Sequence, residues 1–371
     1  MNRVLICSHP YDIHGAVVQC ALRQLGHEPI CWFPGDFPES SRICLEAHSR
    51  SPRLRFDTHA LLPVSGADAL WLRRWRATAH RRGDVSTEQR IRSTHAQQCT
   101  EGALRAISEA AHSVNGFDQA LRAECKIDQL RAAGACGLRV PRTLVSNDPP
   151  AVRAFVRELD GHAVAKPLRA EWLDNADGTI QALHVEAAGP GLLGSDADIA
   201  AMPYIYQQRV DAMFEIRVTV IGEQLFACRV DRHPHSPACV DQHLASVAVA
   251  AHLLEPQLAR RCRDLLDAMD LRFGCIDLLM ARDGTPWFLE VNQAGQFLWV
   301  EHAVPQHRCL AALCALLVGC RAADAPALAT VLQSAPFAAE LRRRLARPAA
   351  TSGFLPRAVE SALVLGEDAL P

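Results

Sequence analysis

The sequence lacks the features that would place the protein in a membrane, outside the cell or on nucleic acid. Its longest apolar stretch, CLAALCALLVGC at 309–320, is too short to span a bilayer. The first residues, MNRVLICSHPYD, hold too short an apolar run for a signal peptide. The formal net charge is −2 at pH 7, so basic side chains are not in excess. We therefore expect a cytoplasmic protein with no nucleic-acid and no membrane partner.

Cysteine is abundant, but the spacing that would give it a role is missing. The chain has 14 cysteines in 371 residues and no C-x-x-C pair. A disulfide framework is typical of short secreted chains, so we expect reduced and mostly buried thiols here. Cys309, Cys314 and Cys320 lie in an apolar segment, and we expect them to be core residues.

The first part of the chain alternates between strand and helix patterns. Apolar runs at 3–7, 28–33 and 67–76 predict strands, and apolar residues at helical spacing predict a helix at 16–26. This β-α-β opening is typical of a parallel sheet. The first turn has no G-x-G-x-x-G, so a dinucleotide fingerprint is not supported. Residues 86–115 predict a helix that is polar on one side.

The middle of the chain predicts helices mixed with strands. The expected elements are helices at 117–137 and 248–271, a strand and a capped helix within 138–159, and strands at 162–168, 204–210, 215–222 and 224–230. Together with the opening, this pattern indicates a combination of α/β and α+β units.

A hairpin is the most specific signal in the chain. The pair Asp283-Gly284 between two apolar runs predicts a two-residue turn. With that turn, Asp277 lies directly across from Glu290, and Asn292 lies two residues further on the same face. Facing carboxylates repel each other, and oxygen ligands of this kind suit magnesium. A solvated polar edge and a carboxylate pair for acid–base chemistry are the alternatives.

Among the cationic side chains that precede the hairpin, three lie in positions that suggest a role in binding an anion. Lys166 ends the apolar strand in VAKP, and Lys126 lies in a helix. Arg217 lies inside EIRVTV, where a cation needs an anionic partner. Each one alone is more often a surface side chain. Together with the hairpin carboxylates they outline a site for a nucleoside triphosphate.

The order of these motifs resembles that of ATP-grasp ligases, and more narrowly that of the graspetide (microviridin-type) ligases that mature ribosomal peptides. The resemblance rests on Lys126, VAKP, YIYQQRVDAMFEIRVTVIG, GCIDLLMARDGTPWFLEVNQAGQFLW, SHPYDIHGAVV and LWLRRWR, and it covers roughly residues 1–320. It implies the ATP-grasp fold. The implied parts are a pre-ATP-grasp α/β domain at 1–115, an ATP-grasp domain of two lobes at 116–322, and a C-terminal tail with a basic helix at 323–371.

The resemblance also implies ATP and Mg²⁺ as cofactors and a role for individual residues. Lys126 and Lys166 would contact the ATP phosphates, and Arg217 would neutralise a phosphate or an acyl phosphate. The other implied assignments are Gln207, Gln208 and Val210 to the hinge that reads adenine, Glu215 to the ribose, Asp277, Glu290 and Asn292 to magnesium, and Arg232 to a further phosphate or substrate contact.

The implied reaction activates a carboxylate as an acyl phosphate and joins it to an amine or a hydroxyl. In the graspetide branch both groups are side chains of one ribosomal precursor peptide, whose leader segment docks on the ligase. A homodimer is compatible with the resemblance. The alternatives are an ATP-grasp ligase for free amino acids or peptide ends, and a nucleotide-binding regulator without turnover. The family's DWR-like stretch is matched by CVDQH at 239–243, without its Trp and Arg, so the choice of substrate is open.

Overall fold

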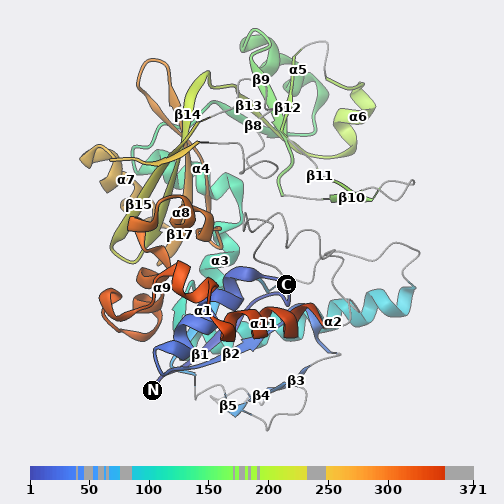
Figure 1. The fold of residues 1–371 in the computed structure, drawn as a ribbon. Helices are drawn as coiled ribbons and strands as arrows, with labels where there is room; N and C mark the ends of the chain where they lie inside the picture. Colours follow the sequence, from blue (N-terminus) through green and yellow to red (C-terminus); the bar gives the residue numbers. More distant parts are fainter. Residues whose placement is uncertain are drawn as a thin grey trace.

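The computed structural model arranges the chain around three main sheets, which follow one another from bottom to top in Figure 1. Every helix in its described part is too short or too polar to cross a bilayer. Two small antiparallel sheets accompany the main ones, β3–β4–β5 (Ser41–Cys44, Arg53–Phe56, Leu62–Pro63) and β10–β11 (Trp172–Asp174, Ile180–Ala182). The structure describes residues 1–38, 41–45, 53–56, 62–63, 67–75, 86–169, 172–174, 180–182, 185–189, 193–231 and 248–346.

The N-terminal sheet is parallel, as the β-α-β pattern predicted. Its strand order is β2 (Glu28–Trp32), β1 (Arg3–Cys7), β6 (Ala69–Leu72) and β7 (His112–Val114). Helix α1 (Ile13–Gln24) packs on one face and helix α2 (Thr87–Ala110) on the other. Asp12 caps α1 by accepting the Gly15 N–H at 3.3 Å. Because the strands run in the same direction, their carboxyl ends meet at one edge.

The largest sheet has five antiparallel strands. Their order is β16 (Val249–Ala251), β15 (Gln224–Val230), β14 (Ala212–Ile221), β17 (Phe273–Ala281) and β18 (Pro286–Asn292). Ile216 and Val218 on β14 are buried in a core that includes helices α4 (Lys126–Ala135) and α7 (Pro256–Ala268). Since successive side chains of a strand alternate, Arg217 points to the opposite face.

A smaller antiparallel sheet lies at the top of Figure 1. Its strand order is β12 (Glu186–Ala187), β9 (Ala163–Lys166), β13 (Tyr204–Gln208) and β8 (Thr143–Ser146). Helices α5 (Pro149–Glu158) and α6 (Asp196–Ala201) cover the face that carries Tyr206 and Ala163. The alternation of the strands therefore turns Lys166 toward the other face.

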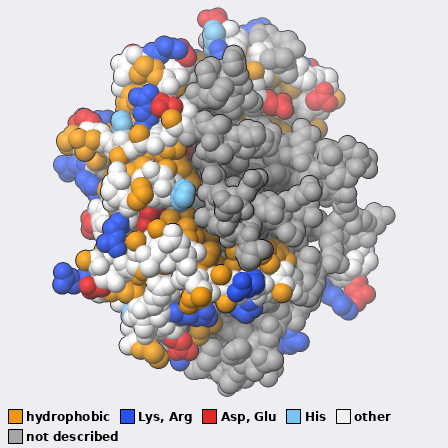
Figure 2. Space-filling view, in the orientation of Figure 1, with side chains coloured by type: hydrophobic (Ala, Val, Ile, Leu, Met, Phe, Trp, Pro, Cys, Tyr) orange, Lys and Arg blue, Asp and Glu red, His pale blue; other side chains and the backbone are white. Residues whose placement is uncertain are grey.

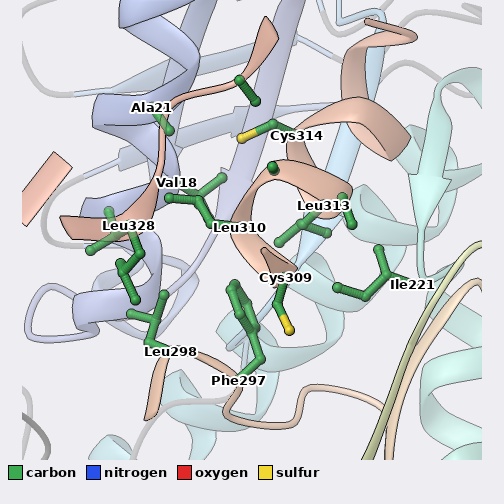
Figure 3. Packing of buried hydrophobic residues seen from close by; sticks show 14 of the residues in the cluster. Val18, Ala21, Ile221, Phe297, Leu298, Cys309, Leu310, Leu313, Cys314 and Leu328 are labelled. Carbon is green, nitrogen blue, oxygen red and sulfur yellow. The ribbon is translucent and has the colours of Figure 1, made fainter. Parts of the chain in front are cut away.

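One apolar core joins the N-terminal sheet to the five-stranded sheet. Figure 3 shows Leu310 and Leu313 beside Val18 of α1 and Ile221 of β14. The helices around this core are α8 (Leu298–Ala303), α9 (Cys309–Val318), α10 (Leu328–Leu332) and α11 (Ala335–Leu345). Shared burial of this kind fixes the two sheets relative to each other.

The cysteine prediction is confirmed for two of its three residues. Cys309 and Cys314 lie on α9 and are fully buried, whereas Cys320 lies beyond the end of α9 and is half-buried. Every cysteine in the described ranges is a free thiol. Burial raises the pKa of Cys309 and of Cys314, so both stay protonated at neutral pH.

The single helix predicted at 117–137 is wrong, because the chain forms two helices there. Helix α3 (Phe117–Ala123) ends before Cys125, and α4 begins at Lys126. Buried Gln129 donates to the Ala123 carbonyl and accepts the Val291 N–H at 3.1 Å. Its side chain thus satisfies a carbonyl that α3 leaves free and ties α4 to β18.

The helix predicted at 248–271 is also too long. Residues 249–251 form the edge strand β16, and α7 begins only at Pro256. Glu255 caps α7 by accepting the N–H groups of Gln257 and Leu258, both at 3.0 Å. A proline at the first helical position restricts the residue before it, so the helix cannot extend further back.

The basic helix expected in the C-terminal tail is α11, and it docks on α1. Arg344 of α11 is buried, with its Nε donating to Glu340 Oε1 at 2.8 Å. Its two terminal nitrogens donate to Gln19 Oε1 at 2.8 Å and to the Asp12 carbonyl at 3.2 Å. The arginine therefore anchors the tail beside the edge where the N-terminal strands end.

The described surface carries charges of both signs. In Figure 2, acidic and basic side chains are interspersed on the visible described face, with apolar atoms between them. This distribution matches the formal net charge of −2. It gives no single-sign field on that face that would attract a polyanion.

Candidate active site

A row of charged side chains crosses the open face of the five-stranded sheet. Arg217 on β14 is the register partner of Asp277 on β17, and Asp277 is the partner of Glu290 on β18. Arg217 Nη1 donates to both carboxylate oxygens of Asp277 at 2.6 Å. Lys126 Nζ lies 2.7 Å from Glu290 Oε2. Alternating positive and negative charges therefore span three strands and the start of α4.

The facing position of Asp277 and Glu290 is confirmed, but the predicted two-residue turn is wrong. Ala281 N donates to the Thr285 carbonyl at 2.9 Å, so the loop has three residues. Gly284 in this loop has a φ of +80°. Such loops need a residue in the left-handed region, which glycine adopts without steric cost. The longer loop shifts the strand pairing next to it by one residue.

A β-bulge at Leu289 restores the pairing further along. Leu289 is the extra residue between two paired positions, Phe288 and Glu290. Phe288 and Val291 are both buried in the same core, although strict alternation would put them on opposite faces. The bulge therefore returns Glu290 to the open face beside Asp277.

The charges of this row perturb one another. Burial and the facing Glu290 carboxylate raise the pKa of Asp277 to about 6, against the lowering effect of Arg217. Burial acts in the same direction on Glu290, but the Lys126 ammonium holds the pKa of Glu290 below its usual value. Burial and Lys126 lower the pKa of Lys166, and Glu290 opposes that shift. The two carboxylates thus face cations from three elements.

The small sheet forms a second wall opposite this row. Lys166 is the register partner of Ile205, and Gln207 lies two residues beyond Ile205 on the same face. Gln207 is buried, and its Nε2 donates to Thr143 Oγ1 at 2.8 Å. The mutual effect of Lys166 and Glu290 on their pKa values means that the Lys166 ammonium lies near the charged row.

The expected hinge residues lie where the chain passes from one wall to the other. Gln208 is the last residue of β13, and Val210 lies in the short connection to β14. Glu215 is on the same face as Arg217, and its charge adds to the burial effect that raises the pKa of Asp277. The connection between the two walls thus carries the Gln208 amide and the apolar side chain of Val210, and the Glu215 carboxylate follows on β14.

Asn292 lies in the next row of the sheet, as the register partner of Cys275. Its Oδ1 accepts the N–H of Ala294 at 3.1 Å. The chain then turns, and the Gln296 carbonyl accepts a hydrogen bond from Arg217 Nη2 at 3.4 Å. The turn after β18 is therefore bonded to two of the candidate site residues.

Gly295 in this turn leaves no room for a side chain. A Cβ at Gly295 would lie 2.4 Å from both Cβ and Sγ of Cys275. We expect Gly295→Ala to lower the free energy of unfolding by about 2 kcal/mol, since the turn must move away from β17. Urea unfolding measures this change. Gly134→Ala in α4 is the matched control, because its Cβ would meet nothing within 4 Å, and there we expect unchanged or higher stability. Equal stability of the Gly295→Ala protein and the wild type would contradict the close approach.

The donor atoms of Asp277, Glu290 and Asn292 fit a hard divalent cation. All three offer oxygen, and the two carboxylates are about a third exposed. Cys275 pairs with Asn292 in the sheet, but its sulfur is a soft donor, whereas a hard cation such as Mg²⁺ selects oxygen ligands. The described residues contain no cluster of three or more His, Cys, Asp or Glu side chains arranged for a metal. An ion here would thus take its remaining oxygens from water and phosphates, as Mg²⁺ commonly does.

Several residues beside the site were missed by the sequence analysis. Arg73 Nη1 donates to the Ala294 carbonyl. His14 Nε2 accepts the N–H groups of Phe297 at 3.1 Å and Leu298 at 3.3 Å. The sequence signal for Arg73 was its position directly after β6, because side chains at the carboxyl edge of a parallel sheet converge on one site. Arg232, the remaining candidate, lies outside the described residues.

No protein-family model matches the chain, and no curated protein matches its sequence. Solved structures do match its fold. The macrocyclase MdnC bound with precursor peptide MdnA from Microcystis aeruginosa MRC is 21% identical, with a TM-score of 0.75, over 86% of this chain and 100% of that one.

Two further structures have the same fold. A RiPP-associated ATP-grasp ligase of Chryseobacterium gregarium, in complex with ADP and a leader and core peptide, is 20% identical with a TM-score of 0.73, over 88% of this chain and 98% of that one. The ATP-grasp ligase PsnB, complexed with a minimal precursor, Mg and ADP, is 22% identical with a TM-score of 0.60, over 84% of this chain and 98% of that one. The chain described here therefore has the fold of the ATP-grasp ligases.

Proposed function

We propose that the protein is an ATP- and Mg²⁺-dependent ligase that joins side chains of a ribosomal precursor peptide. The observation that carries this proposal is the row Arg217–Asp277–Glu290–Lys126, with Lys166 on the wall opposite. A polyphosphate needs cations from more than one side, and a hard metal ion needs facing oxygen ligands. The shared fold supports the same reading, since MdnC and PsnB were solved with precursor peptides.

The residues take separate roles in this proposal. Lys126 and Lys166 hold the ATP phosphates, while Arg217 faces the transferring phosphoryl group. Adenine lies against the passage between the two walls. The complete assignment is Gln207, Gln208 and Val210 to adenine, Glu215 to the ribose, Asp277, Glu290 and Asn292 to Mg²⁺, and Arg232 to a further phosphate or substrate contact.

The chemistry that we propose has two steps. A carboxylate oxygen of the peptide attacks the γ-phosphorus of ATP, and ADP leaves, which makes an acyl phosphate. An amine or hydroxyl of the peptide then attacks the acyl carbon, and phosphate leaves with loss of a proton. Bound Mg²⁺ would offset charge on the phosphate oxygens. Arg217 and Lys166 stabilise the developing negative charge from opposite walls.

The proposal also includes a division of the chain into domains and a cellular location. Residues 1–115 form the pre-ATP-grasp domain, residues 116–322 form the two lobes around ATP, and residues 323–371 form the tail. The small sheet has a core of its own, which supports its assignment as one lobe. The N-terminal sheet shares a core with the five-stranded sheet and with the helices of the tail. We further propose that the protein works in the cytoplasm, where ATP and newly made precursor peptides are available.

The test is co-expression with a small precursor peptide encoded beside this protein. We expect the peptide to lose the mass of one water molecule for each bond formed, with ADP released in proportion. Turnover of free amino acids without any peptide would instead favour an amino-acid ligase. ATP binding without ADP formation, whichever peptide is supplied, would contradict catalysis and favour a nucleotide-binding regulator.

A further inference from the structure

The N-terminal sheet holds the turn that follows β18. Arg73 directly follows β6 and donates to the Ala294 carbonyl. Asn115 directly follows β7, and its Nδ2 donates to the Gln293 carbonyl at 3.0 Å. His14 of α1 accepts two backbone N–H groups at 297–298. All three side chains are buried, so these bonds are shielded from water.

A short chain of contacts leads from Arg73 to the candidate metal ligand Asn292. Arg73 bonds the carbonyl of Ala294, and the N–H of the same residue bonds Asn292 Oδ1 at 3.1 Å. The same turn places the Gln296 carbonyl 3.4 Å from Arg217 Nη2. Any movement of the turn would therefore displace the Asn292 carboxamide oxygen and the Gln296 carbonyl, which both lie beside the charged row.

The charges behind the turn are arranged to keep it in place. Arg73 Nε lies 3.4 Å from Asp12 Oδ2, and Ser8 Oγ donates to that oxygen at 2.6 Å. Although burial opposes its charge, Asp12 keeps a lowered pKa because of Arg73. Burial and Arg73 lower the pKa of His14 to about 3, so its ring is neutral and Nε2 can accept both N–H groups.

A buried arginine is a poor choice if stability alone matters. Arg73 is 2% exposed, and burying such a charge costs several kcal/mol even when a carboxylate faces it. Well-packed apolar side chains are often more stabilising in that place. A guanidinium with several donors can, however, bond the Ala294 carbonyl while it faces Asp12, which holds the turn at a defined distance.

We propose that Arg73 is a positioning residue, through which the N-terminal sheet sets the geometry of the Mg²⁺ and phosphate centre. This inference rests on the proposed function. It assigns to the first domain a part in metal binding without any contact to the metal. Outer-shell partners of metal ligands typically change metal affinity or activity by about 10- to 100-fold when they are removed.

The test follows the rise in melting temperature that Mg²⁺ produces in the full-length protein at fixed ATP. We expect Arg73→Met to raise the Mg²⁺ concentration at half-maximal effect by about 10-fold or more. Arg73→Lys keeps the charge and one donor group, so we expect a rise of only about 3-fold. The readout needs no peptide substrate and no turnover.

Arg344→Met is the matched control. Arg344 is an equally buried arginine beside α1 that bonds the Asp12 carbonyl but touches nothing in the turn. We expect it to lower the melting temperature without changing the Mg²⁺ dependence. An unchanged Mg²⁺ dependence in both Arg73 variants, or an equal shift in Arg344→Met, would overturn the positioning role. A wild-type protein that shows no rise with Mg²⁺ and ATP would instead overturn the proposed function.

Discussion

Glu290→Gln should lower precursor-dependent ADP formation by about 10³-fold or more, which makes it one of the two largest effects we expect. The change removes one of two facing carboxylates that would hold the metal ion. It also leaves Lys126 and Lys166 close together without the anion that now lies near both. Repulsion between the two ammonium groups would displace them from the phosphate positions. The measurement is steady-state ADP release with saturating Mg²⁺ and peptide.

Glu158→Gln is the control for this substitution. It makes the same chemical change in another glutamate ion pair, with Arg142 at 2.6 Å. That pair is exposed, and surface pairs contribute at most about 1 kcal/mol. We expect full activity for Glu158→Gln and an unchanged melting temperature. A Glu290→Gln protein that keeps more than about a tenth of wild-type turnover would rule out the assigned metal role.

Arg217→Met is the second substitution with a large expected effect, and it acts on stability as well as turnover. It removes the cation that bonds both oxygens of Asp277 at 2.6 Å and leaves Asp277 facing Glu290. The pair is partly buried, with 14% of the Arg217 side chain and 30% of the Asp277 side chain exposed, so breaking it from one side should cost about 2 kcal/mol, less than for a fully buried pair. We expect that loss in urea unfolding, together with loss of ADP formation. The guanidinium also lies 5.8 Å from the ring centre of Trp299, a contact that methionine replaces only in part.

A double substitution separates the effect of lost packing from the effect of the uncompensated Asp277 carboxylate. Arg217→Met combined with Asp277→Asn removes both partners of the pair, so we expect most of the stability to return while turnover stays lost. Arg229→Met on the neighbouring strand β15 is the control, because its pair with Asp231 is exposed. Equal instability of the single and the double variant would show that packing, and not the uncompensated carboxylate, explains the loss.

Local patterns in the sequence predicted the part of the site that one sheet carries. The position of Arg217 inside EIRVTV predicted an anionic partner for its cation, and the pairing of β14 with β17 supplies Asp277 as that partner. The facing position of Asp277 was predicted correctly although the turn was not. The three-residue loop and the bulge at Leu289 shift the pairing in opposite directions, so their effects cancel.

Helix boundaries were predicted less well, because contacts far along the chain decide them. Residues 117–137 have a continuous helical pattern, yet the chain breaks before Lys126. Gln129 bonds the end of α3 and also the backbone of Val291, which is 162 residues away. Without that break, Lys126 would not start a helix that points it at Glu290.

The sequence by itself determined the parallel opening of the chain, the charged hairpin and the resemblance to ATP-grasp ligases, since each depends on short-range periodicity or on an ordered set of motifs. Only the tertiary structure decided that the N-terminal sheet supports the site. Arg73 and Ala294 are 221 residues apart, and no local propensity links them. Their contact arises because one apolar core, shared by α1, α9 and β14, brings the edges of two sheets together.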